Sequence, residues 1–148
     1  IAHYINFELK NPEEFVKRSS KVLAKGGVFS FNAEAVNDWN YFFRDALNAV
    51  GVKAPFIDER INEEQAAQDK CDEMLKKYFK KVDCITLVNT WHYTDAEEIL
   101  DRMLRMYEGQ QKLINENRKK ILKYFGDKIE SEGEVTYTKQ SLFRRCSK

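Results

Sequence analysis

The first 32 residues carry the signals of a strand, a helix and a second strand. Residues 1–9 (IAHYINFEL) are rich in apolar and aromatic side chains, which is typical of a strand. Asn11 is suited to cap a helix, Pro12 is tolerated in a first turn, and Gly26 with Gly27 ends a helix in a left-handed turn. Residues 28–32 (VFSFN) then predict a second strand. This order predicts a right-handed crossover and two parallel strands of an α/β sheet.

Apolar residues at helical spacing cover much of the sequence. On the first helix this spacing marks Phe15, Val16, Ser19, Val22 and Leu23 as one face. Further helices are predicted at residues 37–50, 62–78, 94–107 and 112–130, with a loop containing Pro55 at residues 52–61. Strands are predicted at residues 81–91 and 134–146, the second with a bulge or bend at Gln140–Ser141. The alternation of helices and strands predicts an α/β fold.

Composition excludes several classes of protein. The chain has 148 residues, which suits one domain, and 43% hydrophobic residues, which argues against disorder. Lys plus Arg number 25 against 24 Asp plus Glu, so the net charge favours neither nucleic acid nor an anionic membrane. No apolar run reaches the ~18 residues of a membrane span. The three widely spaced cysteines are typical of a reduced, cytoplasmic protein.

Four phrases in order resemble the class I S-adenosylmethionine-dependent methyltransferases, and most closely their small-molecule "type 11" branch. They are KVLAKGG (21–27), MLKKYFKKVDCITL (74–87), YTDAEEILDRML (93–104) and GEVTYTKQSLFRRC (133–146). The first is similar to the family phrase R-V-L-K-P-G-G, with Ala24 and Lys25 in place of Lys and Pro. In the third, Thr94 and Glu97 form a predicted capping box.

The resemblance implies a three-layer, Rossmann-like methyltransferase fold with a mixed sheet, of which this chain is the C-terminal portion. The strands at residues 1–9, 28–32 and 81–91 would be the parallel fourth, fifth and sixth strands. The last strand would insert antiparallel between the fifth and sixth. Residues 1–148 would form a single domain, part of a larger one, with an inserted helical cap at about residues 37–80.

The same resemblance identifies features of the family that this sequence lacks. The family holds its cofactor with a glycine-rich turn after the first strand and a carboxylate after the second. Neither occurs here, and the adjacent glycines, Gly26 and Gly27, follow a helix. We therefore expect Ile1 to fall within the fourth strand and most of the S-adenosylmethionine site to come from residues that precede it.

The remaining site residues are assigned from the carboxyl ends of the predicted strands, where ligands of open α/β sheets bind. By resemblance, Ala2 and His3 form part of the cofactor site, and His3 is the candidate catalytic residue, because imidazole titrates near neutrality. The candidate substrate-binding residues are Tyr4, Asn6, Asn32 and Trp39. Asn32 also fits a turn residue, and Trp39 also fits a packed core. No spacing predicts a metal site, and the terminal LFRRCSK predicts a solvated end.

The predicted function is methyl transfer from S-adenosylmethionine to a small-molecule acceptor, in a chain that is incomplete for it. One alternative is a non-catalytic α/β binding module without the cofactor site. A second is an α/β domain in which the phrase ending in Gly26–Gly27 is coincidental. If residues 1–7 are an interior strand of a larger sheet, their edge should pair with the missing N-terminal half or with another chain.

Overall fold

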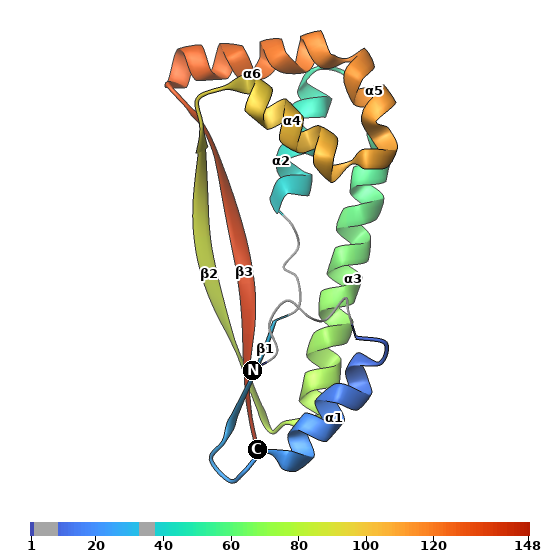
Figure 1. Ribbon diagram of the computed structural model, residues 1–148, viewed down its shortest axis with the longest axis vertical. Helices are drawn as coiled ribbons and strands as arrows, with labels where there is room; N and C mark the ends of the chain where they lie inside the picture. Colours follow the sequence, from blue (N-terminus) through green and yellow to red (C-terminus); the bar gives the residue numbers. More distant parts are fainter. Residues whose placement is uncertain (2–8, 33–37) are drawn as a thin grey trace. The chain divides into compact units, whose positions relative to one another are not determined.

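The computed structural model describes residue 1 and residues 9–32 and 38–148. These residues form a mixed α/β fold of six α-helices and one three-stranded antiparallel sheet (Figure 1). In chain order the elements are α1 (Pro12–Val22), β1 (Val28–Asn32), α2 (Asp38–Ala49), α3 (Pro55–Tyr78), β2 (Lys81–Tyr93), α4 (Ala96–Met106), the 3₁₀ helix η2 (Glu108–Gln110), α5 (Gln111–Glu116), α6 (Arg118–Glu132) and β3 (Val135–Ser147). The α/β class predicted from the sequence is confirmed.

The last strand, β3, lies between β1 and β2 and runs antiparallel to both. Its pairing with β1 extends from Val28 opposite Ser147 to Asn32 opposite Phe143. The predicted insertion of the last strand between two earlier strands is therefore confirmed, and β1 and β2 run in the same direction. The described strands form no parallel Rossmann sheet. Most of the strand predicted at residues 1–9 lies outside the described residues.

The chain divides into two compact units. One consists of residues Ile1–Asn37, Ile61–Val88 and Gln140–Lys148, and the other of Asp38–Arg60 and Asn89–Lys139. We call them the first and the second unit. Helix α3 and strands β2 and β3 each contribute residues to both. The single domain with a helical cap at about residues 37–80 stays a prediction.

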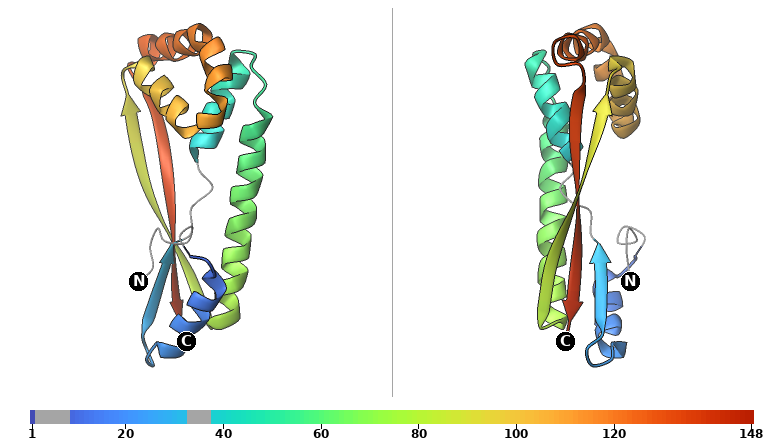
Figure 2. Two further views of the ribbon diagram at one scale, coloured as in Figure 1. Left: turned by 45° about the vertical axis from the view of Figure 1, so that its right-hand side comes forward. Right: turned by 90° about the vertical axis from the view of Figure 1, so that its left-hand side faces the viewer.

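The first unit buries one face of β1 and β3 beneath α1 and the C-terminal part of α3 (Figure 2). Phe29 of β1 stacks on Phe79, with 5.5 Å between ring centroids. The core consists of Val16, Phe29, Phe31, Cys71, Leu75, Phe79 and Cys146. Each large apolar side chain buried in this way stabilises the fold by about 1.5–3 kcal/mol. Val22, which helical spacing assigned to the packed face of α1, is instead 84% exposed.

Arg144 is buried in the first unit, with 2% of its side chain exposed. It lies opposite Phe31 in the sheet, and its Nε donates to Asp72 Oδ1 on α3 at 2.9 Å. The prediction of a solvated terminal segment is therefore wrong for Arg144, and also for Cys146, which is fully buried. Both residues are buried because this segment pairs with β1.

The second unit is built around an aromatic cluster. Trp39 of α2 stacks on Tyr137 of β3, with 3.6 Å between ring centroids, and Phe42 stacks on Phe125 of α6 at 5.5 Å. The Tyr107 hydroxyl donates to Asn40 Oδ1 at 2.6 Å, which satisfies two buried polar groups. Helix α4 packs on α6 in the same unit.

The structure corrects two helix boundaries predicted from the sequence. Helix α3 begins at Pro55, so the loop predicted at residues 52–61 is mostly helical, and Asn62 does not start a helix. Proline is common at the first helical position because its missing N–H has no partner there. Helix α4 is capped by Asp95 and not by Thr94, since Asp95 Oδ1 accepts from the Glu97 amide at 2.9 Å.

The helix predicted at residues 112–130 is divided. Helix α5 ends at Glu116 and α6 begins at Arg118, with Asn117 between them. Gly133 ends α6 with φ at 85°, as its position in the sequence predicted. No described helix has the length and apolar character that crossing a membrane requires.

Replacing Asp72 tests the buried ion pair. Asp72→Asn should lower the free energy of unfolding by roughly 1.5–3 kcal/mol, because the Arg144 guanidinium then stays buried without its anionic acceptor. Denaturant unfolding followed by circular dichroism measures the loss. Asp69→Asn is the matched control, since Asp69 is an exposed carboxylate on the same helix. Equal losses in the two variants would contradict a specific role for the Arg144–Asp72 pair.

Candidate functional site

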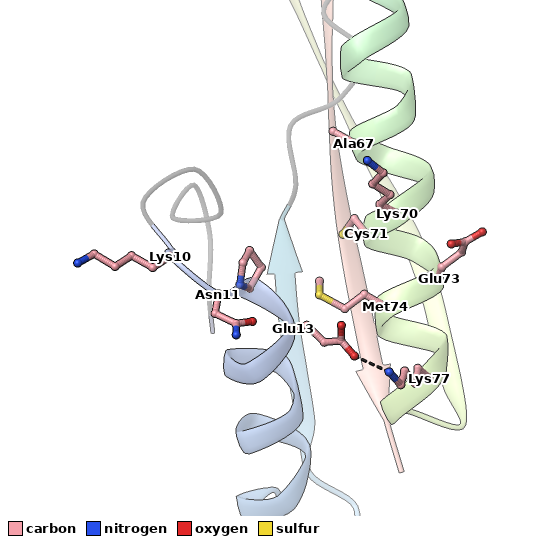
Figure 3. A pocket seen from close by; sticks show the side chains of 10 residues that line it. Lys10, Asn11, Glu13, Ala67, Lys70, Cys71, Glu73, Met74 and Lys77 are labelled. Atoms are coloured by element: carbon pink, nitrogen blue, oxygen red, sulfur yellow. Dashed lines mark hydrogen bonds and ion pairs between the residues drawn. The ribbon is translucent and has the colours of Figure 1, made fainter.

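A cleft of about 620 Å³ lies in the first unit between the start of α1 and the C-terminal part of α3 (Figure 3). We call it the α1–α3 cleft. Its lining residues are Lys10, Asn11, Pro12 and Glu13 on one side and Ala67, Lys70, Cys71, Glu73, Met74 and Lys77 of α3 on the other. The volume falls within the range of small-molecule sites.

The local sequence explains why α1 begins at this cleft. Asn11 Oδ1 accepts a hydrogen bond from the Glu14 amide at 3.0 Å, and Pro12 opens the helix without an N–H to satisfy. Helix α1 ends close to the start of β1, with only a short turn at Gly26 between them. The start of α1 therefore lies at the same end of the unit as the carboxyl end of β1 (Figure 3).

An ion pair joins the two walls of the cleft. Lys77 Nζ of α3 lies 2.5 Å from Glu13 Oε1 of α1, and the Tyr78 hydroxyl donates to the same oxygen at 2.7 Å. These two hydrogen bonds, that of Lys77 first, hold the pKa of Glu13 below its usual value. The Glu13 carboxylate in turn raises the pKa of Lys77. Glu13 is thus ionised near neutral pH and is poorly suited to supply a proton in catalysis.

The other groups of the cleft favour binding over covalent chemistry. Lys10 and Lys70 add positive charge to that of Lys77, against the carboxylates of Glu13 and Glu73. Burial raises the pKa of the Cys71 thiol to about 11, so the thiolate that would act as a nucleophile is scarce at neutral pH. The cleft is suited to a small ligand that carries an anionic group.

The described residues are a poor match for S-adenosylmethionine by themselves. Its sulfonium is cationic, and the α1–α3 cleft is lined by three lysines against two glutamates, of which Glu13 is already paired with Lys77. The ribose of the cofactor needs a protein carboxylate as its partner, and the carboxylate of the cofactor needs free backbone amides at a glycine-rich turn that leads into a helix. Gly26 and Gly27 do not form such a turn, because they follow helix α1. Over the described part of the chain no group of three or more His, Cys, Asp or Glu side chains is arranged to hold a metal ion.

Asn32, a predicted substrate-binding residue, lies at the carboxyl end of β1 and is only 1% exposed. Its Nδ2 donates to the Leu142 carbonyl of β3 at 2.9 Å. Its Oδ1 is buried and has no hydrogen-bond partner among the described residues. The amide nitrogen of Asn32 therefore joins β1 to β3. The contact of Asn32 with substrate stays a prediction.

Trp39, the other described candidate, belongs to the second unit and is 1% exposed. Besides its stack on Tyr137, its ring lies 4.0 Å from the Arg102 guanidinium carbon. Trp39 is therefore part of the core of that unit. The sequence alone is compatible both with this core position and with a role in substrate binding. Asn32 and Trp39 belong to different units.

The remaining predicted site residues, Ala2, His3, Tyr4 and Asn6, lie outside the described residues. The lysines and Glu13 of the α1–α3 cleft were not predicted. Only the acidic first turn of α1 was visible in the sequence, and nothing in it indicated that Lys77, more than sixty positions later, would pair with Glu13.

Comparisons with known proteins identify no family for this chain. No family model matches it, and no curated protein matches it significantly.

The thiols provide a test of burial in the first unit. Burial raises the pKa of Cys71 to about 11 and of Cys146 to about 12, while Cys84 is exposed. In the native protein only Cys84 should react rapidly with Ellman's reagent at neutral pH, and the other two should react after unfolding. Rapid reaction of all three thiols would contradict the described core.

The same shifts predict a loss of stability in alkali. Above the ordinary thiol pKa of 9.0 the unfolded chain releases protons that native Cys71 and Cys146 retain, so the free energy of unfolding should fall as pH rises from about 9 to 11. Denaturant unfolding at several pH values gives the slope. The double variant Cys71→Ala, Cys146→Ala should show a shallower slope than the unaltered chain, and an equal slope would assign the effect to other groups.

Proposed function

We propose that this chain is the C-terminal part of an S-adenosylmethionine-dependent methyltransferase that acts on a small-molecule acceptor. The observation that carries the proposal is the order of the sheet, β1-β3-β2, with the last strand antiparallel between two strands of one direction. The resemblance of the four sequence phrases implied this order. A late strand that inserts between two earlier ones is a specific topology, and it supports the proposal more than any single phrase does.

The finer fold belongs to the same proposal. Among the described strands β1 has a neighbour on one side only, and that neighbour is β3. A Rossmann-like sheet would continue on the other side of β1, with the predicted fourth strand at residues 1–7 parallel to it. In that arrangement His3, Tyr4 and Asn6 would lie toward the carboxyl end of the fourth strand, near Asn32. The N-terminal half would then supply the glycine-rich turn and the ribose carboxylate.

The chemistry of methyl transfer is compatible with the side chains of the α1–α3 cleft. Methyl transfer from a sulfonium needs positioning of the acceptor and exclusion of water more than it needs a nucleophile on the protein. The α1–α3 cleft has no activated nucleophile, since Glu13 is paired and the Cys71 thiol is protonated. Its lysines would position an anionic acceptor.

The cleft also favours a second candidate function, a non-catalytic binding module. Its volume and its lysines would serve a small anionic ligand without any cofactor. The two candidates differ in a single requirement: the methyltransferase needs S-adenosylmethionine bound by residues that precede Ile1, and the module does not.

Calorimetric titration with S-adenosylmethionine separates them. The 148-residue chain should give no measurable heat, because it lacks the glycine-rich turn. The same chain extended by the residues encoded upstream of Ile1 should bind S-adenosylmethionine, and S-adenosylhomocysteine should compete. An extended protein that binds neither would overturn the methyltransferase and favour the module. Micromolar binding by the 148-residue chain alone would show that the cofactor site does not depend on upstream residues.

A further inference from the structure

The charged side chains of the α1–α3 cleft differ in what they can offer a ligand. Lys77 is paired with Glu13 at 2.5 Å. The side chains of Lys10 and Glu73 point away from the space between α1 and α3 (Figure 3). Lys70 also lines the cleft and forms no ion pair with any described residue. Among the described lining residues, its ammonium is therefore the charge that remains available to a ligand.

Apolar side chains form the surface of the cleft beside Lys70. Cys71 and Met74 of α3 point toward the space between the two helices (Figure 3). Pro12 and Ala67 add apolar surface to the lining. Cys71 is only 4% exposed, and Met74 packs partly against the core. Because a thiol and a thioether are weak hydrogen-bonding groups, this surface is suited to the apolar part of a ligand.

Other classes of ligand fit this arrangement less well. A nucleotide or another polyphosphate would bring several negative charges to one uncompensated ammonium, and no arginine is among the described lining residues. A cationic ligand would find the Glu13 carboxylate already occupied by two hydrogen bonds. A sugar would lose hydrogen bonds to water at Cys71 and Met74 without replacing them.

We propose that the α1–α3 cleft binds a small amphipathic monoanion, with its anionic group at the Lys70 ammonium and its apolar part against Cys71 and Met74. The charge-assisted hydrogen bond to Lys70 fixes the orientation of the ligand. Contact with the two sulfur-containing side chains removes apolar surface from water and supplies affinity. Small-molecule sites commonly combine a mostly apolar lining with a few polar groups in this way.

The identity of this monoanion as the methyl acceptor rests on the proposed function. Its binding does not, because every residue that it contacts belongs to the first unit of the 148-residue chain. The ligand class can therefore be tested without cofactor. The titration of the extended protein with S-adenosylmethionine tests methyl transfer separately, so that either proposal can fail while the other holds.

Calorimetric titration of the 148-residue chain with three probes tests the ligand class. Octanoate has the anionic group and an apolar chain, octylammonium has the chain with the opposite charge, and acetate has the anionic group alone. Octanoate should bind with a stoichiometry of one and at least tenfold more tightly than either of the others, because only octanoate satisfies both parts of the cleft. Absence of octanoate binding, or equal affinity for octanoate and either other probe, overturns the proposal.

A charge-reversal pair on α3 tests the role of Lys70. Lys70→Glu should weaken octanoate binding at least tenfold, because it replaces the attracting ammonium with a repelling carboxylate. Lys76→Glu is the matched control, since Lys76 is an exposed lysine of the same helix that is not among the lining residues and the net charge changes equally. Circular dichroism establishes that both variants are folded. Equal weakening in the two variants would show that octanoate responds to overall charge and overturns the proposal.

Protection from alkylation locates the ligand independently of the charge variants. In a Cys84→Ser background, which removes the exposed native thiol, Ala67→Cys places a thiol in the cleft and Lys76→Cys places one outside it. Saturating octanoate should slow the reaction of iodoacetamide at position 67 and leave the rate at position 76 unchanged, as measured by mass spectrometry. An unchanged rate at position 67, or equal slowing at both positions, would place octanoate elsewhere and overturn the proposal.

Discussion

The insertion of β3 between β1 and β2 is the constraint on which the rest of the structure depends. One strand supplies both cores, because Tyr137 stacks beneath Trp39 in the second unit while Arg144 and Cys146 are buried in the first. The buried positions of β3 change from odd to even numbers between Ser141 and Arg144. The bulge or bend predicted at Gln140–Ser141 lies at the start of the part of β3 that belongs to the first unit, and it stays a prediction.

Signals confined to a few residues predicted the fold well. The Asn11 cap, the turn at Gly26, the end of α6 at Gly133 and the long strands were all visible, because each depends on the backbone preferences of neighbouring residues. Features that depend on distant partners were not visible. Arg144 reads as part of a basic, solvated end, and only the pairing of β3 with β1 and the approach of Asp72 make its burial tolerable.

The candidate site residues also differ in whether local sequence or distant contacts determine them. Its residues near Ile1 were assigned by resemblance and concern a part of the chain outside the described residues. The α1–α3 cleft arises where two helices far apart in the sequence converge, and its lysines look like ordinary surface residues in each helix alone. Helical spacing indicates which side of α3 is buried, but it cannot indicate that Lys77 meets Glu13. Trp39 shows the converse, since an aromatic residue suited to a pocket serves as the centre of a core.

The pairing of β1 with β3 also bears on the order in which the chain can fold during synthesis. Val28 is opposite Ser147, so β1 gains its neighbour only after the long segment between them has left the ribosome. Until then the phenyl rings of Phe29 and Phe31 lack the side chains of Arg144 and Cys146 beside them. Contacts of such large sequence separation slow folding, and the nascent chain has to be kept from sticking to others during that interval.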